Sequence, residues 1–285
     1  AEVELANDFS LSAFIPEWGS STQYISTIIY GMLGFELMSS ASEEMKNPRR
    51  DVPRAIFASG IVIFLAYVLG TFAILAAVPI DDIDLVEGLV DTLRQLFGTS
   101  GIGVAVATLF GVFALFTFFS NTTTWALGAN RAAAEAAIDG ELPNFLAKEH
   151  ATHGTPIGAA FTMGAIVTII LVTYGLLAGS NEDLFWKLFA ASAVLFLMPY
   201  VGAVAAFLRA RRIDPDRERP FRVPGGMPLA IVITSVCIFI LLTSILLFMY
   251  VPGAGFDWPV VFGSFAAIIL GEIAIRYAEH ESRSE

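Results

Sequence analysis

Five long stretches without a charged residue constrain the fold of this chain more than any other feature. They cover residues 55–78, 101–130, 156–179, 188–208 and 223–256. A run of about 18 or more apolar residues is long enough to cross the hydrocarbon core of a bilayer as a helix. One such run could lie in the core of a soluble protein, but a chain of 285 residues cannot bury five. The sequence therefore predicts an all-α polytopic membrane protein.

Composition argues against several other classes of protein. Only 15% of the residues are charged, whereas soluble domains carry about 25%. The net charge of −11 argues against a nucleic-acid partner. The single cysteine, Cys237, lies in an apolar run, so neither a disulfide nor a thiolate metal site is predicted. We find no nucleophile–base pair or phosphate-binding loop, and His150 and His153 lie in a polar loop; we expect no enzyme activity, catalytic residue, cofactor or metal.

Two weaker apolar segments raise the predicted number of membrane spans to seven. Residues 1–21 are predicted to form an extracytoplasmic lead, and residues 22–285 a transmembrane domain. Residues 79–100 have an amphipathic helical pattern, typical of a helix on the outer surface that serves either as a cap or as a lid. The predicted spans cover about 22–42, 55–78, 102–127, 157–178, 187–208, 228–250 and 258–275.

The basic residues predict how these spans are oriented. Of the sixteen lysines and arginines, fourteen lie after the first, third, fifth and seventh spans, and only Arg94 and Lys187 fall on the other side. Cytoplasmic loops carry an excess of lysine and arginine. The sequence therefore predicts that residues 43–54 and the C-terminus are cytoplasmic, in a protein of the plasma membrane.

The first span contains two glycines and a carboxylate near its middle. Gly31 and Gly34 each lower helix propensity by about 1 kcal/mol relative to alanine. Glu36 follows at once, and intramembrane acids usually face a cavity or a charged partner. Close packing of two helices would also explain the glycines. The combination favours a broken helix, whose unwound backbone could hold the carboxylate and ammonium groups of a zwitterion.

Three other intramembrane features have two interpretations each. Residues 121–124 are polar, and their threonines could bond within the helix or hold sodium; we favour the first. Trp125 could pack in the core or gate a cavity. Pro199 and Tyr200 could form a structural kink or a gate. Glu272 precedes Arg276 by four residues, which predicts an ion pair at the end of the last span.

Three motifs resemble those of amino acid–polyamine–organocation permeases. The first comprises residues 34–36 and 43–56, the latter reading EEMKNPRRDVPRAI. The second comprises residues 125–131, 139–143 and 154–156, and the third is RPFRVPGG at residues 219–226. The similarity extends from about residue 22 to the end. Among subfamilies, the spacing is most similar to that of glutamate/GABA and arginine/agmatine exchangers.

This resemblance implies a LeuT-type fold, with two inverted five-helix repeats and two extra helices. The seven spans would be helices six to twelve, namely the second repeat plus the two extra helices. An odd number of spans that starts outside agrees with helices one to five preceding this chain. The implied function is secondary active transport of an amino acid or amine by alternating access, proton-linked or by exchange. A scaffold or nutrient sensor that kept the fold without transport is the alternative.

The resemblance also implies roles for individual residues and partners. The implied partners are an amino acid or amine substrate, the lipid bilayer, a proton as candidate coupling ion, and the five preceding helices. Residues of the unwound stretch would contact substrate, and three further residues would act as gates or in proton coupling. The substrate-binding residues would be Tyr30, Gly31, Met32, Leu33, Gly34 and Phe35, and the gate or coupling residues Glu36, Trp125 and Tyr200.

Overall fold

The computed structural model divides the chain into two compact units. One consists of Ala1–Asp82 with Phe189–Val260, and the other of Ile83–Leu188 with Val261–Glu285. The structure describes residues 5–10, 12, 15, 22–34, 45–83, 92–94, 97–98, 100–219 and 222–284.

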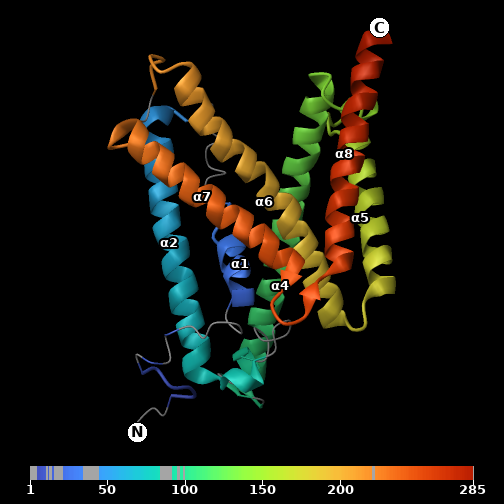
Figure 1. The fold of residues 1–285 in the computed structure, drawn as a ribbon. Coiled ribbons are helices and arrows are strands. Elements are labelled where there is room, and N and C mark those ends of the chain that lie inside the picture. Colours follow the sequence, from blue (N-terminus) through green and yellow to red (C-terminus); the bar gives the residue numbers. More distant parts are fainter. Residues whose placement is uncertain are drawn as a thin grey trace. The chain divides into compact units, whose positions relative to one another are not determined.

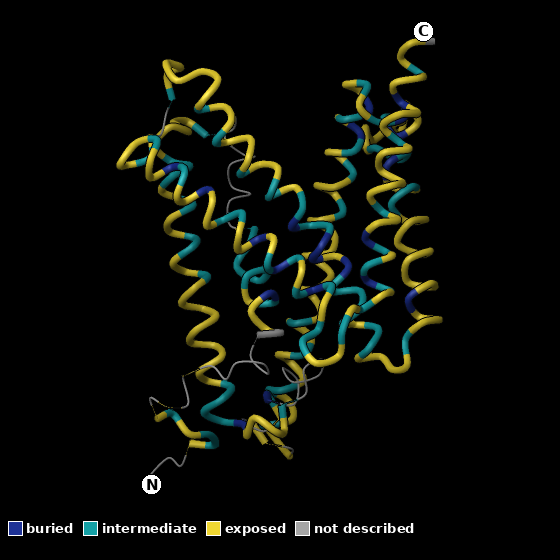
Figure 2. The backbone as a smooth tube through the Cα atoms, in the orientation of Figure 1, coloured by how far each residue is buried: buried dark blue, intermediate teal, exposed yellow. Residues whose placement is uncertain are grey.

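Six helices in the described part of the chain are long and apolar enough to cross a membrane (Figure 1). Most residues along α2, α4 and α5 are exposed, as the yellow colour in Figure 2 shows, and many of these exposed residues are large and apolar. Such surfaces are stable in contact with lipid rather than with water. The chain is therefore part of an all-α, multi-pass membrane protein, as predicted. The helices are α2 (Pro48–Ala77), α4 (Ile102–Ile138), α5 (Ile157–Leu177), α6 (Asn181–Ile213), α7 (Gly226–Met249) and α8 (Trp258–Ser284).

Several helices continue beyond the apolar runs that predicted them. Helix α4 extends past residue 127 to Ile138, where Asp139 is the C-cap and Gly140 has a φ of 78°. Helix α6 ends at Ile213, just before the Asp214–Pro215 pair. Apolar residues mark only the part of a helix that lies in lipid, whereas glycine, proline and capping residues decide where it ends.

In the first unit, residues of the N-terminal lead form hydrogen bonds and a ring contact with the end of α2. The Asn7 side-chain amide donates to the carbonyl oxygens of Leu75 (2.6 Å) and Val78 (2.7 Å), and its oxygen accepts from Ile80 N–H (3.0 Å). The Phe9 ring lies 4.9 Å from that of Phe72. The last carbonyl groups of a helix have no hydrogen-bond donor within the helix. At this end of α2, the Asn7 side-chain amide donates to two carbonyl groups. The described part of the lead is thus packed against a helix end.

Half of the predicted surface helix at 79–100 lies outside the described residues. A short 3-10 helix, η3, covers Ile80–Asp82. Residues 92–94 and residue 97 are helical, and Phe97 stacks on Phe110 at 5.7 Å. Both the cap and the lid interpretations remain predictions.

In the second unit, the loop after α4 folds back on α4 and α5. It contains a 3-10 helix, η4 (Asn144–Ala147), with Leu146 buried. Gly158 N–H donates to the Lys148 carbonyl (3.0 Å), and Asn144 N–H donates to the Glu281 carboxylate of α8 (3.0 Å). A Cβ at Gly158 would lie 1.9 Å from the Phe145 carbonyl oxygen. Only glycine therefore allows η4 to approach α5 this closely.

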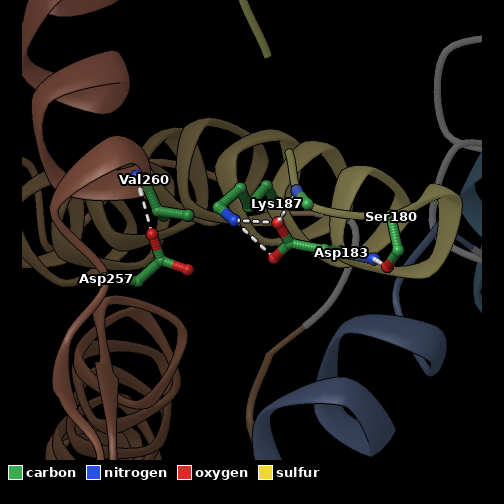
Figure 3. A network of polar contacts seen from close by, with 6 residues as sticks. Ser180, Asp183, Lys187, Asp257 and Val260 are labelled. Carbon is green, nitrogen blue, oxygen red and sulfur yellow. Dashed lines mark hydrogen bonds and ion pairs between the residues drawn. The ribbon is translucent and has the colours of Figure 1, made fainter. Parts of the chain in front are cut away.

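The starts of α6 and α8 are each closed by a side-chain cap (Figure 3). Ser180 Oγ accepts from Asp183 N–H (3.1 Å) at the start of α6, and Asp257 accepts from Val260 N–H (3.3 Å) at the start of α8. Lys187 pairs with the Asp183 carboxylate one turn away. Lys187 is one of the two basic residues outside the predicted cytoplasmic set, and this ion pair offsets its charge.

Candidate functional site

Helix α1 (Thr22–Gly31) ends at the first of the two glycines in the first predicted span. Met32 N–H bonds to the Ile28 and Ile29 carbonyls (3.1 and 3.2 Å), and Leu33 N–H bonds to the Tyr30 carbonyl (3.1 Å). Gly34 then takes a φ of +103°, which L-residues with a side chain rarely adopt. The chain therefore leaves the helix within the apolar segment. Phe35 and Glu36 lie outside the described residues.

The end of α1 has a distinct electrostatic character. The carbonyl end of a helix carries the negative pole of the helix dipole. Irregular backbone within an apolar segment is tolerated only where protein or a water-filled cavity surrounds it. The stretch 31–34 thus combines backbone acceptors with a negative pole, an arrangement that favours a cationic group such as an ammonium.

Tyr30, the last residue before this stretch, lies in an aromatic cluster. Its ring is edge-on to those of Phe189 (5.2 Å), Phe196 (5.6 Å) and Phe248 (6.2 Å). Phe196 in turn lies 5.3 Å from Tyr200. Edge-to-face pairs stabilise by about 0.5–1.5 kcal/mol each beyond area burial. The aromatic cluster (Tyr30, Phe189, Phe196, Tyr200 and Phe248) thus fixes the ring of Tyr30 against α6 and α7.

The aromatic cluster connects two residues that the sequence singled out separately, Tyr30 and Tyr200. It also contains three phenylalanines that sequence reasoning missed. On α6, residues 189, 196 and 200 recur at helical spacing, which places them on one face. That spacing was a usable signal for Phe189 and Phe196. For Phe248 no such signal exists, because its partners are distant in the sequence.

Tyr67 of α2 is a further residue that sequence reasoning missed. A Cβ placed on Gly31 would lie 3.5 Å from the Tyr67 hydroxyl oxygen. The side chain of Tyr67 therefore reaches the point where α1 ends. It brings a hydroxyl group, which can both donate and accept, next to the irregular stretch. Tyr67 is the one tyrosine in the uncharged run 55–78, a weak but available signal.

Pro199 lies within α6, immediately before Tyr200. Proline has no N–H, so the helix lacks its hydrogen bond to the carbonyl of Leu195. Helix α6 nevertheless continues without interruption from Asn181 to Ile213. The proline therefore leaves a weakened turn beside the aromatic cluster, where Phe196 and Tyr200 lie.

Trp125 belongs to α4, in the other compact unit, where its side chain is about half exposed. The threonines before it bond within their own helix. Thr122, Thr123 and Thr124 donate to the carbonyls of Phe118 (2.9 Å), Phe119 (2.8 Å) and Ser120 (2.9 Å). The favoured interpretation of residues 122–124 is thus confirmed. Their hydroxyl groups therefore donate hydrogen bonds to carbonyl oxygens of their own helix.

The structure also describes the predicted ion pair at the end of α8 and the two histidines in the loop after α4. Glu272 accepts from Arg276 Nε at 2.8 Å, which confirms the ion pair that the spacing predicted. His150 and His153 are exposed and stack on each other at 4.9 Å between ring centres. Within the described ranges, no group of three or more histidines, cysteines or acids is placed to hold a metal ion.

Comparison with known proteins agrees with this architecture. The amino acid permease family model matches residues 5–271. A probable agmatine/putrescine antiporter, AguD, of Lactococcus lactis is 33% identical over 279 residues, which are 95% of this chain and 59% of that protein. A glutamate/gamma-aminobutyrate antiporter of Lactococcus lactis is 26% identical over 224 residues, which are 75% of this chain and 43% of that protein.

The branched-chain amino acid permease BcaP of Bacillus subtilis is also similar. It is 26% identical over 215 residues, which are 75% of this chain and 43% of that protein. The chain therefore spans about half the length of the curated relatives it matches. The family model covers nearly all of the chain, and the relatives are permeases and antiporters by name. The chain belongs to the amino acid permease family.

Proposed function

We propose that the protein containing this chain transports an amino acid or related amine across the membrane by alternating access. The observation that carries the proposal is the end of α1 at Gly31, followed by irregular backbone through Gly34. Broken helices near the bilayer midplane form substrate sites in many secondary transporters, because unwound backbone and helix ends bind charged groups. Membership of the permease family supports the same conclusion.

Within this proposal, the residues around the end of α1 contact substrate. These are Tyr30, Gly31, Met32, Leu33, Gly34 and Phe35. Tyr200 acts as a gate residue, because the aromatic cluster couples it to Tyr30 through Phe196. Trp125 is proposed as a second gate residue. Glu36 is proposed to link transport to proton movement.

The relatives suggest which substrates to test first. One is a probable agmatine/putrescine antiporter and another a glutamate/gamma-aminobutyrate antiporter. Both names describe exchange. We therefore propose exchange of amines or amino acids, and the test is uptake of labelled agmatine, putrescine, glutamate or GABA into liposomes with and without internal substrate. Flux that depends on internal substrate supports exchange, whereas binding without flux would favour the sensor alternative.

Replacing Glu36 with glutamine tests proton linkage. An amide cannot take up a proton, so the Glu36→Gln protein should transport more slowly and with a flatter pH dependence. The measurement is initial uptake rate against pH in proteoliposomes made with the protein as its gene encodes it. Glu272→Gln is the matched control, because Glu272 pairs with Arg276 on an exposed part of α8. An unaltered pH profile in Glu36→Gln would leave Glu36 a role in gating or packing only.

We further propose that residues 43–54 and the C-terminus face the cytoplasm, on the basis of the fourteen basic residues on one side. In a protein whose native cysteine is replaced (Cys237→Ser), cysteines at Ser180 and Thr152 should react from opposite faces. Both positions are exposed, and α5 separates them. A membrane-impermeant maleimide applied to intact cells should label the Ser180→Cys protein but not the Thr152→Cys protein. Labelling of both from outside would refute the proposed orientation.

A further inference from the structure

Two basic segments that are far apart in the sequence form one surface in the first unit. Arg49 Nη1 lies 3.4 Å from Glu218 Oε1, which joins the start of α2 to the loop after α6. In Figure 1 the start of α2 lies at the same end of this unit as the end of α6. We call this the basic surface, and its basic members are Lys46, Arg49, Arg50, Arg54, Arg209, Arg211, Arg212, Arg217, Arg219 and Arg222.

The sign of this surface is opposite to that of the whole chain. The described residues in 45–54 and 209–222 include ten basic side chains and four acidic ones, whereas the chain has a net charge of −11. A positive surface of this kind attracts anions, and clustering in space, rather than total charge, determines the local potential. The acidic members are Asp51, Asp214, Asp216 and Glu218.

The basic surface begins where the apolar surfaces of α2 and α6 end. On α2, Arg54 is followed by Phe57 and Ile61, whose side chains are exposed. On α6, the exposed Phe207 is followed by Arg209. Exposed phenylalanine and isoleucine on a membrane span require contact with acyl chains or with another apolar helix. The arginines that flank them, within about one turn on the same helices, therefore lie at the level of the lipid headgroups.

Three of the basic side chains already have structural roles. Arg219 donates to the carbonyls of Ala210 (3.2 Å), Pro215 (3.3 Å) and Arg217 (3.1 Å), which fastens the loop to the end of α6. Arg49 pairs with Glu218, and the Arg211 guanidinium lies 4.3 Å from the Phe207 ring centre. The Arg211 contact holds a charge against the last apolar ring.

The other seven basic side chains make no ion pair with any residue that the structure describes. Six are arginines, and all seven are exposed. The guanidinium group binds phosphate oxygens in a bidentate manner and is more weakly hydrated than an ammonium. The seven are Lys46, Arg50, Arg54, Arg209, Arg212, Arg217 and Arg222.

We propose that the basic surface binds the phosphate headgroups of anionic phospholipids in the adjoining leaflet. Three observations on this surface support that occupant. The surface is positive, it lies directly beyond the membrane-spanning parts of α2 and α6, and most of its arginines make no ion pair with a residue that the structure describes. Basic clusters immediately beyond a membrane helix bind anionic lipids for the same reasons. This inference does not depend on transport, and it assigns the surface a lipid ligand in addition to its role in orientation.

The test is lipid retention by native mass spectrometry of the protein as its gene encodes it, in mild detergent. With equimolar phosphatidylglycerol and phosphatidylcholine, the protein should retain phosphatidylglycerol preferentially. The triple variant Arg50→Gln/Arg212→Gln/Arg217→Gln should bind phosphatidylglycerol about fivefold more weakly, with phosphatidylcholine unchanged. It leaves seven of the ten basic residues in place, so the charge bias that orients the helices remains.

Two further variants make the result specific. Arg131→Gln/Lys148→Gln/Arg283→Gln removes the same charge elsewhere and should retain phosphatidylglycerol. The variant Arg50→Lys/Arg212→Lys/Arg217→Lys keeps the positive charges, so it should retain most of the phosphatidylglycerol binding. Equal loss in the control variant, no loss in the first variant, or displacement of the lipid by excess inorganic phosphate would overturn the proposal.

Discussion

Replacing Gly34 with alanine should weaken amino-acid binding at least tenfold, which corresponds to about 1.4 kcal/mol. Gly34 has a φ of +103°, in a region that a residue with a Cβ enters only at a cost of about 1–3 kcal/mol. Among the residues that the structure describes, no atom lies within 4 Å of the position of that Cβ, so the expected effect comes from the backbone conformation. Alanine would shift the irregular stretch that we propose as the substrate site. The measurement is substrate-dependent thermal stabilisation in detergent, which reports occupancy without requiring transport.

Gly31→Ala tests the other glycine of the proposed substrate site. A Cβ at Gly31 would lie 3.5 Å from the Tyr67 hydroxyl, which is an ordinary van der Waals contact. Gly31 is the last residue of α1, and alanine favours the helix by up to about 1 kcal/mol. Because Gly31 needs no positive φ, Gly31→Ala should lower the substrate affinity less than Gly34→Ala does. If both variants bind as the parent does, the glycines serve helix packing, and the substrate site lies elsewhere.

Replacing Gly158 with alanine should lower the thermal stability of the protein. The new Cβ would lie 1.9 Å from the Phe145 carbonyl oxygen and 3.2 Å from the Leu146 Cα. These are backbone atoms, so η4 would have to move away from α5. Overpacking of this kind costs about 1–3 kcal/mol. At about 2–4 °C per kcal/mol for a domain of this size, Tm should fall by roughly 5 °C in a thermal unfolding scan.

Gly164→Ala lies on the same helix and provides the comparison. No atom of a described residue comes within 4 Å of the position of its Cβ. Alanine in a helix interior is more favourable than glycine by about 1 kcal/mol, so Tm should stay unchanged or rise slightly. Equal decreases in Tm for the two variants would show that α5 is sensitive to any added methyl group, and that η4 is not held by close approach at Gly158.

Local features were predictable from the sequence because each depends on a few neighbouring residues. The uncharged runs predicted helices within lipid, since a single apolar chain can satisfy its backbone there only as a helix. The glycine pair favoured a break in the first span, and α1 ends at Gly31, while the rest of that span from residue 35 lies outside the described residues. The spacing of Glu272 and Arg276 predicted their ion pair. The permease motifs predicted the family that the comparisons show.

Contacts between distant segments were decided by the tertiary structure alone. Tyr30 meets Phe189 and Phe248 from two other helices, Gly158 is pressed against η4, and Arg49 reaches Glu218. Helices such as α5 and α7 consist of apolar residues around their whole circumference, so no polar stripe marks which side faces another helix. Between lipid-exposed helices the hydrophobic effect provides no driving force, and shape, close approach and a few polar contacts select the partners. These depend on three-dimensional complementarity, which the order of residues along one chain does not display.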